Sequence, residues 1–141
     1  MAGAGRRMTR IALVFTLAAG LAGCATLPAA CPPGLARQET AELLFGRNIA
    51  GAPGVTDADW TAFVDAEITP RFPDGLTVLD GQGQWRGESG VVEREGSKLV
   101  LLVLSGSPDE AARLDAVRAA YKARFRQEAV LLIRRPACIA F

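Results

Sequence analysis

The sequence predicts an α+β domain in which two helices cover one face of a four-stranded antiparallel sheet. Two segments carry helix start signals followed by apolar residues at helical spacing. Two β-rich stretches lie between these segments, and one further strand-like stretch lies at each end of the domain. The expected element order is therefore β-α-β-β-α-β.

The first strand is expected within residues 40–49, TAELLFGRNI, where an apolar centre runs into glycine and asparagine. That pattern is typical of a strand that ends in a loop. The following loop, GRNIAGAPG over residues 46–54, is rich in glycine but lacks the Gly-Lys-Ser/Thr ending of a phosphate-binding loop. The spacing therefore does not favour a nucleotide site of that kind.

The first helix should begin after Thr56, a good N-cap, with Asp59 completing a capping box three residues later. One apolar face follows at helical spacing, made of Trp60, Phe63, Val64 and Ile68. Because Pro70 disfavours the helical conformation of the residue before it, the helix should end by about Thr69. We interpret Trp60 as part of the core rather than a platform for a ligand.

The two middle strands differ in character. Residues 76–86 change from apolar to polar and glycine-rich, which is typical of an edge strand with a bulge. Residues 91–95 continue through Gly96 into an unbroken apolar run over 99–104, which indicates a buried strand. The sequence RGESG, 86–90, is a suitable hairpin connection between them.

The second helix should begin with a capping box at Ser107-Pro108-Asp109-Glu110, with Ser107 as N-cap and proline at the first helical position. Its buried stripe is expected to be Leu114, Val117, Tyr121 and Phe125. The last strand lies within 129–141. Since Pro136 in this stretch cannot donate to a ladder, the strand belongs at an edge.

The element order and the composition of the strands favour the ferredoxin-like split βαβ topology with sheet order 4-1-3-2. In that order the second and fourth strands are the edges, which suits the glycine-rich and the proline-bearing strand. The end of the fourth strand then lies beside the start of the first.

The N-terminal residues 1–23 have the layout of a secretory signal peptide. Three arginines precede the uncharged apolar run 11–21, which is too short to span a membrane. Met8 serves equally well as the start, because a complete signal follows it. The run ends in LAGC, residues 21–24, which resembles a bacterial lipobox and predicts a lipid on Cys24. The alternative is an ordinary signal cut at a small residue, with Cys24 incidental.

A lipid on Cys24 would attach the protein to the membrane on the periplasmic side of the cell envelope. Ala25 follows, rather than the aspartate associated with inner-membrane retention, so the resemblance favours the outer membrane. Residues 24–38 are then a lipidated, proline-rich tether, and residues 39–141 form a single domain.

Two further cysteines, Cys31 and Cys138, are expected to form a disulfide in the oxidising periplasm. The bond would close a loop of about 106 residues, contributing about 4 to 5 kcal/mol in the chain-entropy model and often less in practice. The alternative is two buried free thiols. The six residues between Cys24 and Cys31 span at most about 25 Å, so the bond would hold the domain close to the membrane.

The charge of the mature chain argues against nucleic acid as a partner. Three arginines leave with the signal, so 13 basic residues remain against 15 acidic ones, a net charge near −2. Nucleic-acid-binding domains carry a clearly basic surface.

Several motifs together resemble a family of bacterial secreted proteins and lipoproteins, domain of unknown function 3574. They are the lipobox, TAELLFGRNI, ITPRFPDGLTVLDGQGQWR, SKLVLLVL and AAYKARFRQEAVL. The resemblance covers about residues 38–141 and implies no activity, substrate or cofactor. The recurring positions of the family stand here as Phe45, Gly46, Arg47, Pro70, Arg71, Phe72, Pro73, Gly75, Gln84, Trp85, Lys98 and Tyr121.

The chain has no histidine, which excludes catalytic triads built on histidine and most zinc sites. We therefore expect no catalytic residue, no metal and no cofactor. The carboxylates of the middle strands and their turns are interpreted as solvated surface groups; they are Asp74, Asp80, Glu88, Glu93 and Glu95.

Two sets of residues are candidates for contacts. Arg118, Lys122 and Arg126 share one face of the second helix, where they would meet lipid headgroups or, as we prefer, form a solvated face partly paired with Asp115.

The second set is Arg47, Asn48, Arg71, Gln84, Trp85 and Lys98. Arg71 is expected at the other end of the sheet from Arg47, so the whole set should not converge. Gln84, Trp85 and Lys98 would meet across the hairpin and suit a sugar or a peptide. The alternative is simple cross-strand packing of the tryptophan with the lysine stem.

The sequence thus predicts a lipid-anchored, non-catalytic binding or accessory module of the envelope, monomeric or a homodimer, whose partner is a small ligand or another envelope protein. The alternative is a small histidine-free enzyme with a pocket on the sheet face or at a dimer interface.

Overall fold

The computed structural model describes residues 30–141. The predicted signal peptide, the lipid site at Cys24 and the start of the tether lie outside these residues. In the described part, no helix has the length and apolar character needed to cross a membrane.

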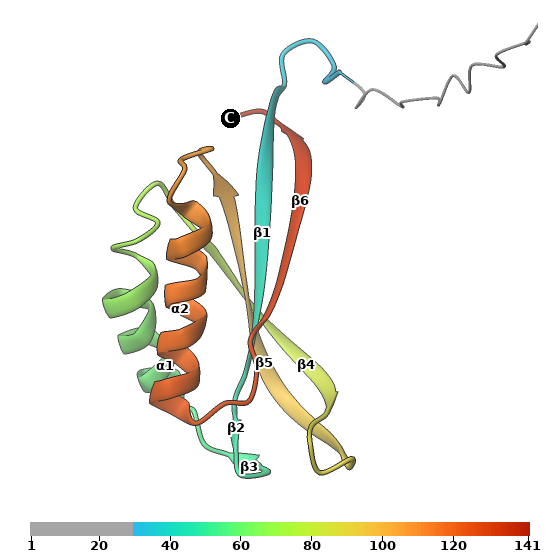
Figure 1. Cartoon of the computed structure of the whole chain (residues 1–141), viewed down its shortest axis with the longest axis vertical. Coiled ribbons are helices and arrows are strands. Elements are labelled where there is room, and N and C mark those ends of the chain that lie inside the picture. The colour runs from blue at the N-terminus through green and yellow to red at the C-terminus, as the bar shows by residue number, and fades with distance from the viewer. Residues whose placement is uncertain (1–29) are drawn as a thin grey trace, which may run out of the picture.

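Four antiparallel strands form the sheet, and the helices cover one of its faces (Figure 1). The strands are β1 (Ala36–Gly46), β4 (Thr77–Arg86), β5 (Val92–Leu104) and β6 (Leu131–Ile139), in the order β4-β5-β1-β6. The short strands β2 (Asn48–Ile49) and β3 (Ala52–Pro53) make a separate hairpin. The helices are α1 (Asp57–Phe63), which continues as the π-helical turn η1 (Val64–Ile68), and α2 (Glu110–Phe125). The predicted ferredoxin-like order is confirmed, with β4 and β6 at the edges.

The strand β1 begins at Ala36, earlier than the pattern indicated, and so takes in residues 36–38 of the expected tether. It extends this far because Ala36 pairs with Ile139 at the end of β6. Beside this pair, Cys31 and Cys138 form the predicted disulfide. The exposed start of β1 carries no apolar alternation, so the sequence pattern could not reveal it.

The bulge expected in β4 is absent. The strand pairs with β5 residue for residue, from Thr77 opposite Leu101 to Arg86 opposite Val92. At least one glycine in this strand has a steric role instead. A Cβ at Gly81 would lie only 2.9 Å from the Ser97 hydroxyl oxygen, so glycine there makes room for the neighbouring strand.

A cluster of aromatic rings forms the centre of the core between the sheet and the helices. Phe45 of β1 packs edge-on against Trp60, Phe63 and Tyr121, with ring centroids 4.7 to 6.1 Å apart. The Tyr121 hydroxyl donates a hydrogen bond to the Gly46 carbonyl at 2.8 Å. Burial raises the pKa of Tyr121 far above its ordinary value, so its proton stays in place. Trp60 is therefore a core residue, as predicted.

The start of α1 matches the sequence closely. The Asp59 amide donates to the Thr56 hydroxyl and the Thr56 amide donates to the Asp59 carboxylate, each at 3.1 Å. The helical path ends at Ile68, shortly before Pro70, as expected.

The capping box predicted for α2 is wrong. This helix begins at Glu110, and Ser107 does not cap it. The Ser107 hydroxyl instead donates a hydrogen bond to the Asp109 carboxylate, so the hydroxyl does not cap the backbone amides of the first helical turn. The Glu110 carboxylate accepts from the Gly106 amide and the Ser105 hydroxyl, each at 3.0 Å, so these contacts tie the helix to the end of β5.

Candidate functional site

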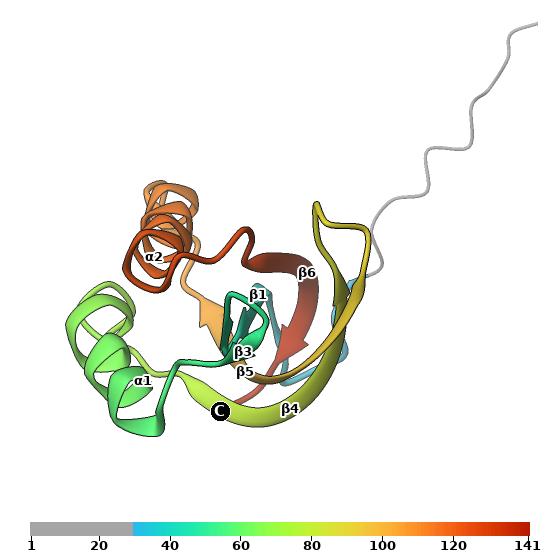
Figure 2. The same cartoon turned by 90° about the horizontal axis from the view of Figure 1, so that it is seen from below.

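A pocket of about 600 Å³ lies mainly on the open face of the sheet and extends to Arg118 of α2. It sits at the end of the sheet where β1 stops. Three segments surround it: the β4–β5 hairpin, the β2–β3 hairpin and the connection from α2 to β6. Figure 2 shows the twisted sheet curving so that the β4–β5 hairpin comes round toward the start of β6. The pocket is therefore the hollow side of that curve.

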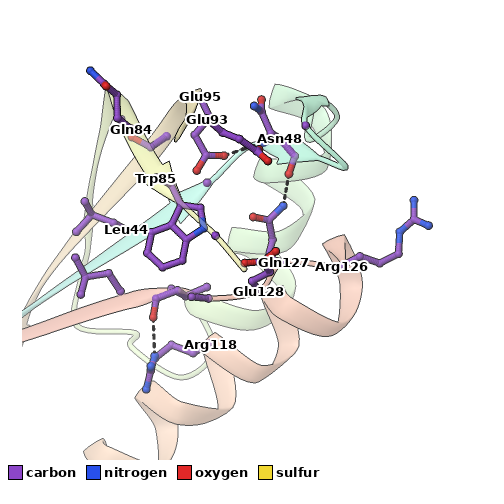
Figure 3. A pocket seen from close by; sticks show the side chains of 18 of the residues that line it. Leu44, Asn48, Gln84, Trp85, Glu93, Glu95, Arg118, Arg126, Gln127 and Glu128 are labelled. Carbon is purple, nitrogen blue, oxygen red and sulfur yellow. Dashed lines mark hydrogen bonds between the residues drawn. The ribbon is translucent and has the colours of Figure 1, made fainter. Parts of the chain in front are cut away.

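The alternation of β4 and β5 decides which side chains face this hollow. Trp85 lies opposite Glu93 in the ladder, and Gly83 lies opposite Glu95. Alternate residues of a strand point to the same face. These four residues therefore share the open face, and all four line the pocket. The Trp85 side chain stands at its centre, 46% exposed (Figure 3).

Two glycines shape the floor of the pocket. A Cβ at Gly46 would lie 2.6 Å from both carboxylate oxygens of Glu95, so a larger residue there would require that carboxylate to shift from its place across the end of β1. A Cβ at Gly83 would meet nothing within 4 Å, because the space beside it is the pocket itself. Glu95 is thus flanked by glycine on both neighbouring strands.

A close contact between the hairpin and the α2–β6 connection forms one wall. The Glu88 amide donates to Glu128 Oε2 at 3.4 Å. A Cβ at Gly87 would lie 2.6 Å from the same oxygen and 3.1 Å from Trp85 Nε1, so a larger residue there would require the Glu128 side chain to shift. The contact joins the ends of the two edge strands across the hollow.

Asn48 connects the β2–β3 hairpin to β5 and to the segment that follows α2. Its amide donates to Glu95 Oε2 at 3.1 Å, and its side-chain nitrogen donates to the Arg94 carbonyl at 3.3 Å. The Gln127 side-chain amide donates to the Asn48 carbonyl (Figure 3). The β2–β3 hairpin is thereby held between β5 and the end of α2.

Of the predicted ligand contacts, Gln84 and Trp85 line the pocket, whereas Arg47 and Lys98 do not. Lys98 lies opposite Asp80 on the face that the helices cover, and its residue is 7% exposed. It cannot meet Trp85, which stands farther along the hairpin on the other face. The proposed meeting of Gln84, Trp85 and Lys98 therefore does not occur. Alternation puts Trp85 on the other face from Gln84 and Lys98, and Gln84 lies opposite Arg94, four residues along β5 from Lys98.

Arg47 and Lys98 instead converge on Asp57 at the start of α1. Arg47 Nη2 and Lys98 Nζ each lie 3.1 Å from Asp57 Oδ1, and Lys98 Nζ also pairs with Asp80 at 2.5 Å. The hydrogen bond with Asp80 raises the pKa of Lys98 above 10.5, so the amine stays charged at neutral pH. Arg47 also donates to the Val55 carbonyl from Nε at 2.9 Å. These two residues hold α1 against the sheet.

The pH dependence of this cluster is predictable. The hydrogen bond from Lys98, followed by the charge of Arg47, holds the pKa of Asp57 below its ordinary value of 3.8. A lowered pKa stabilises the fold above the unfolded value, and the contribution is lost as pH falls through the folded value. Asp57→Asn should therefore lower the free energy of unfolding at neutral pH, and its difference from wild type should shrink below pH 3.8.

Urea denaturation at several pH values measures this difference. Asp65→Asn is a matched control, because Asp65 lies in η1 and makes no ion pair with the described residues. A difference between wild type and Asp57→Asn that stays constant down to pH 2 would contradict the ion-pair role.

The remaining predicted residues are dispersed. Arg71 pairs with Glu67 at 2.7 Å beyond the end of η1, away from Arg47, as expected. Arg118 and Arg126 line the pocket while Lys122 does not. The three basic residues do not form one helical stripe, because α2 stops at Phe125 and Arg126 takes a left-handed conformation with φ 52°.

Glu93 and Glu95 were predicted to be solvated surface groups, but both line the pocket. The hairpin alternation, with Trp85 opposite Glu93, was the signal that could have placed them. Gln127 and Glu128 were missed altogether, because they lie in a connection without periodicity. The described residues contain no group of three or more histidine, cysteine, aspartate or glutamate side chains placed to hold a metal ion.

A family model described as "Protein of unknown function (DUF3574)" matches residues 40–141. No curated protein matches the chain. Among solved structures, a phage SAM lyase in complex with S-methyl-5'-thioadenosine is similar, with a TM-score of 0.60 and 17% identity, covering 82% of this chain and 97% of that chain.

The phage SAM lyase in its apo state has a TM-score of 0.56 and 18% identity, with coverage of 82% and 97%. CutA from Synechococcus elongatus has a TM-score of 0.47 and 10% identity, covering 72% of this chain and 78% of that chain. At these identities, the likeness to the lyase concerns the fold alone.

Proposed function

Because this chain belongs to the family of proteins of unknown function DUF3574, whose description assigns no activity, we propose a function from the pocket itself. The protein is a non-catalytic binding module of the bacterial cell envelope, anchored by a lipid on Cys24. It takes a small organic molecule into the pocket on the open face of its sheet.

The observation that carries this proposal is the pocket of about 600 Å³ with the half-exposed Trp85 at its centre. Ligand pockets typically measure about 300 to 1,000 Å³ and combine aromatic surface with a few polar groups. The lining supplies both, since Leu44 and Trp85 stand beside Asn48 and Glu93. A ligand of drug or nucleoside size suits this space.

The position of the pocket supports access from the periplasm. The disulfide lies at the start of β1, where Arg37 pairs with Cys138, and the pocket lies at the Gly46 end of the same strand. Nine residues of extended strand separate the two ends by about 30 Å. Figure 1 shows the start of β1 and the β2–β3 hairpin at opposite ends of the domain. A lipid tether that ends at Cys31 therefore leaves the mouth of the pocket far from its attachment point.

A histidine-free enzyme is the second candidate, and one observation favours it. Glu93 and Glu95 face the same pocket, and two neighbouring carboxylates can exchange protons with a substrate. The two candidates differ in outcome: a binding module releases its ligand unchanged, whereas an enzyme converts it. Mass spectrometry of the ligand after prolonged incubation with the protein separates them.

Filling the pocket tests the binding function. Gly83→Leu should place its side chain in the empty space over β4 and lower ligand binding at least tenfold, about 1.4 kcal/mol. Stability should not fall, since glycine within a strand costs about 0.5 to 1 kcal/mol relative to alanine. Small molecules that co-purify with the envelope protein would be released by denaturation and compared by mass spectrometry.

Gln82→Leu is the matched control, because it introduces the same side chain one residue away on the opposite face of β4. S-methyl-5'-thioadenosine, the ligand named for the phage lyase, is a defined probe of suitable size for the same pair of variants. Identical small-molecule profiles in wild type, Gly83→Leu and Gln82→Leu would overturn the binding function.

A further inference from the structure

The charges around the pocket are unequally compensated, and this inequality points to the class of ligand. Three carboxylates line the pocket, from Glu93, Glu95 and Glu128. Glu95 and Glu128 accept hydrogen bonds from the backbone amides of Asn48 and Glu88. Within the part of the chain that the structure describes, none of the three forms an ion pair with lysine or arginine. Their negative charge is therefore available to a ligand.

The two arginines of the lining are directed elsewhere. Arg118 Nη1 pairs with Asp115 at 2.8 Å, and its Nε donates to the Val130 carbonyl at 3.1 Å. Figure 3 shows Arg126 pointing away from Trp85 and the glutamates. Arg94 lies between Glu93 and Glu95 in sequence, so alternation turns it to the other face of β5.

Trp85 adds the second recognition element. An indole face attracts cations through its quadrupole, and tryptophan is the most effective ring for this. Trp85 and Glu93 are directly opposite in the ladder, on adjacent strands and on the same face. A cation resting against the indole would therefore lie within reach of a carboxylate.

We propose that the pocket selects an organic cation, such as a quaternary ammonium or sulfonium compound, over neutral and anionic molecules of the same shape. This inference rests on the proposed binding function and deepens it. Trp85 contributes the aromatic surface and the three glutamates contribute the charge. Because Gly83 has no side chain, the space beside it is free for the ligand.

The ligand is a free molecule rather than a headgroup of the anchoring bilayer. The disulfide end of the domain and the pocket lie at opposite ends of β1. With the tether attached at that far end, the bilayer lies away from the pocket.

The test compares choline with its uncharged isostere 3,3-dimethylbutan-1-ol. Binding is followed by NMR through the two indole N–H signals of the chain. The signal of the exposed Trp85 should move, while that of the buried Trp60 should remain in place. Choline should bind at least about tenfold more tightly than the alcohol, and high salt should weaken choline alone.

Variants assign the effect to the carboxylates. Glu93→Gln combined with Glu95→Gln keeps the shape and should lower choline affinity about tenfold while leaving the alcohol unchanged. Glu88→Gln is the matched control, since Glu88 lies at the tip of the same hairpin outside the pocket lining. Phosphatidylcholine vesicles should not move the Trp85 signal, and a response to vesicles would assign the site to headgroups.

Equal affinities for choline and the alcohol would overturn the charge selection. If Gly83→Leu then abolished both, the pocket would still be a binding site and only its preference would be wrong. A Trp85 signal that moves with neither probe would also overturn the cation inference, whereas the binding function is decided by the co-purified small molecules.

Discussion

Replacing Phe45 with alanine should lower the free energy of unfolding by about 3 to 5 kcal/mol, the usual cost of removing a buried aromatic ring. Phe45 is 0% exposed and touches the rings of Trp60, Phe63 and Tyr121. Its removal leaves a cavity at the junction of the sheet and both helices. Guanidinium denaturation followed by circular dichroism measures the loss.

Phe141→Ala is the matched control, because the same atoms are removed from a side chain that is 103% exposed. Surface substitutions of this kind usually change stability by less than about 0.5 kcal/mol. A loss below about 1 kcal/mol for Phe45→Ala would mean that the aromatic cluster does not form the core.

Removing the disulfide should be the next largest change. Cys31→Ser with Cys138→Ser should lower the free energy of unfolding by about 2 to 4 kcal/mol, since the bond joins residues 107 positions apart and restricts the unfolded chain. The same denaturation experiment measures it.

The wild type in dithiothreitol should lose the same stability, and the double variant should not respond to the reagent. Non-reducing peptide mapping should link the peptides of Cys31 and Cys138. Two alkylatable thiols in protein from the oxidising periplasm, or a double variant as stable as wild type, would refute the stabilising role.

The fold was predictable from local signals that agree with one another. The capping box of Thr56 and Asp59 marks the start of α1, the run 99–104 marks the central strand, and Pro136 marks an edge. Each of these signals depends only on a few residues that are neighbours in the sequence. The sheet order followed because only one common topology places both marked strands at the edges.

The site was less predictable because it depends on how distant segments meet. The pocket exists because the sheet twists until the β4–β5 hairpin reaches Glu128, and no local pattern contains that contact. Gln84 and Trp85 line the pocket, but Lys98, which was expected to meet them across the hairpin, lies on the face that the helices cover. There its charge is compensated by Asp57 and Asp80.

The glycines were misread for a related reason. Gly81 and Gly83 indicated a bulge, yet one avoids a neighbouring side chain and the other borders empty space. A glycine in a strand indicates that a side chain is disfavoured at that position. The surrounding sequence does not show which neighbouring group in the fold is the cause.

The disulfide also changes how the domain responds to proteases. Residues 32–35 form an exposed loop between Cys31 and β1, the kind of segment that proteases cut first. Because Cys31 is bonded to Cys138, a cut in this loop would leave the two fragments joined through sulfur. Cleavage there would release the folded domain from its N-terminal segment only after reduction.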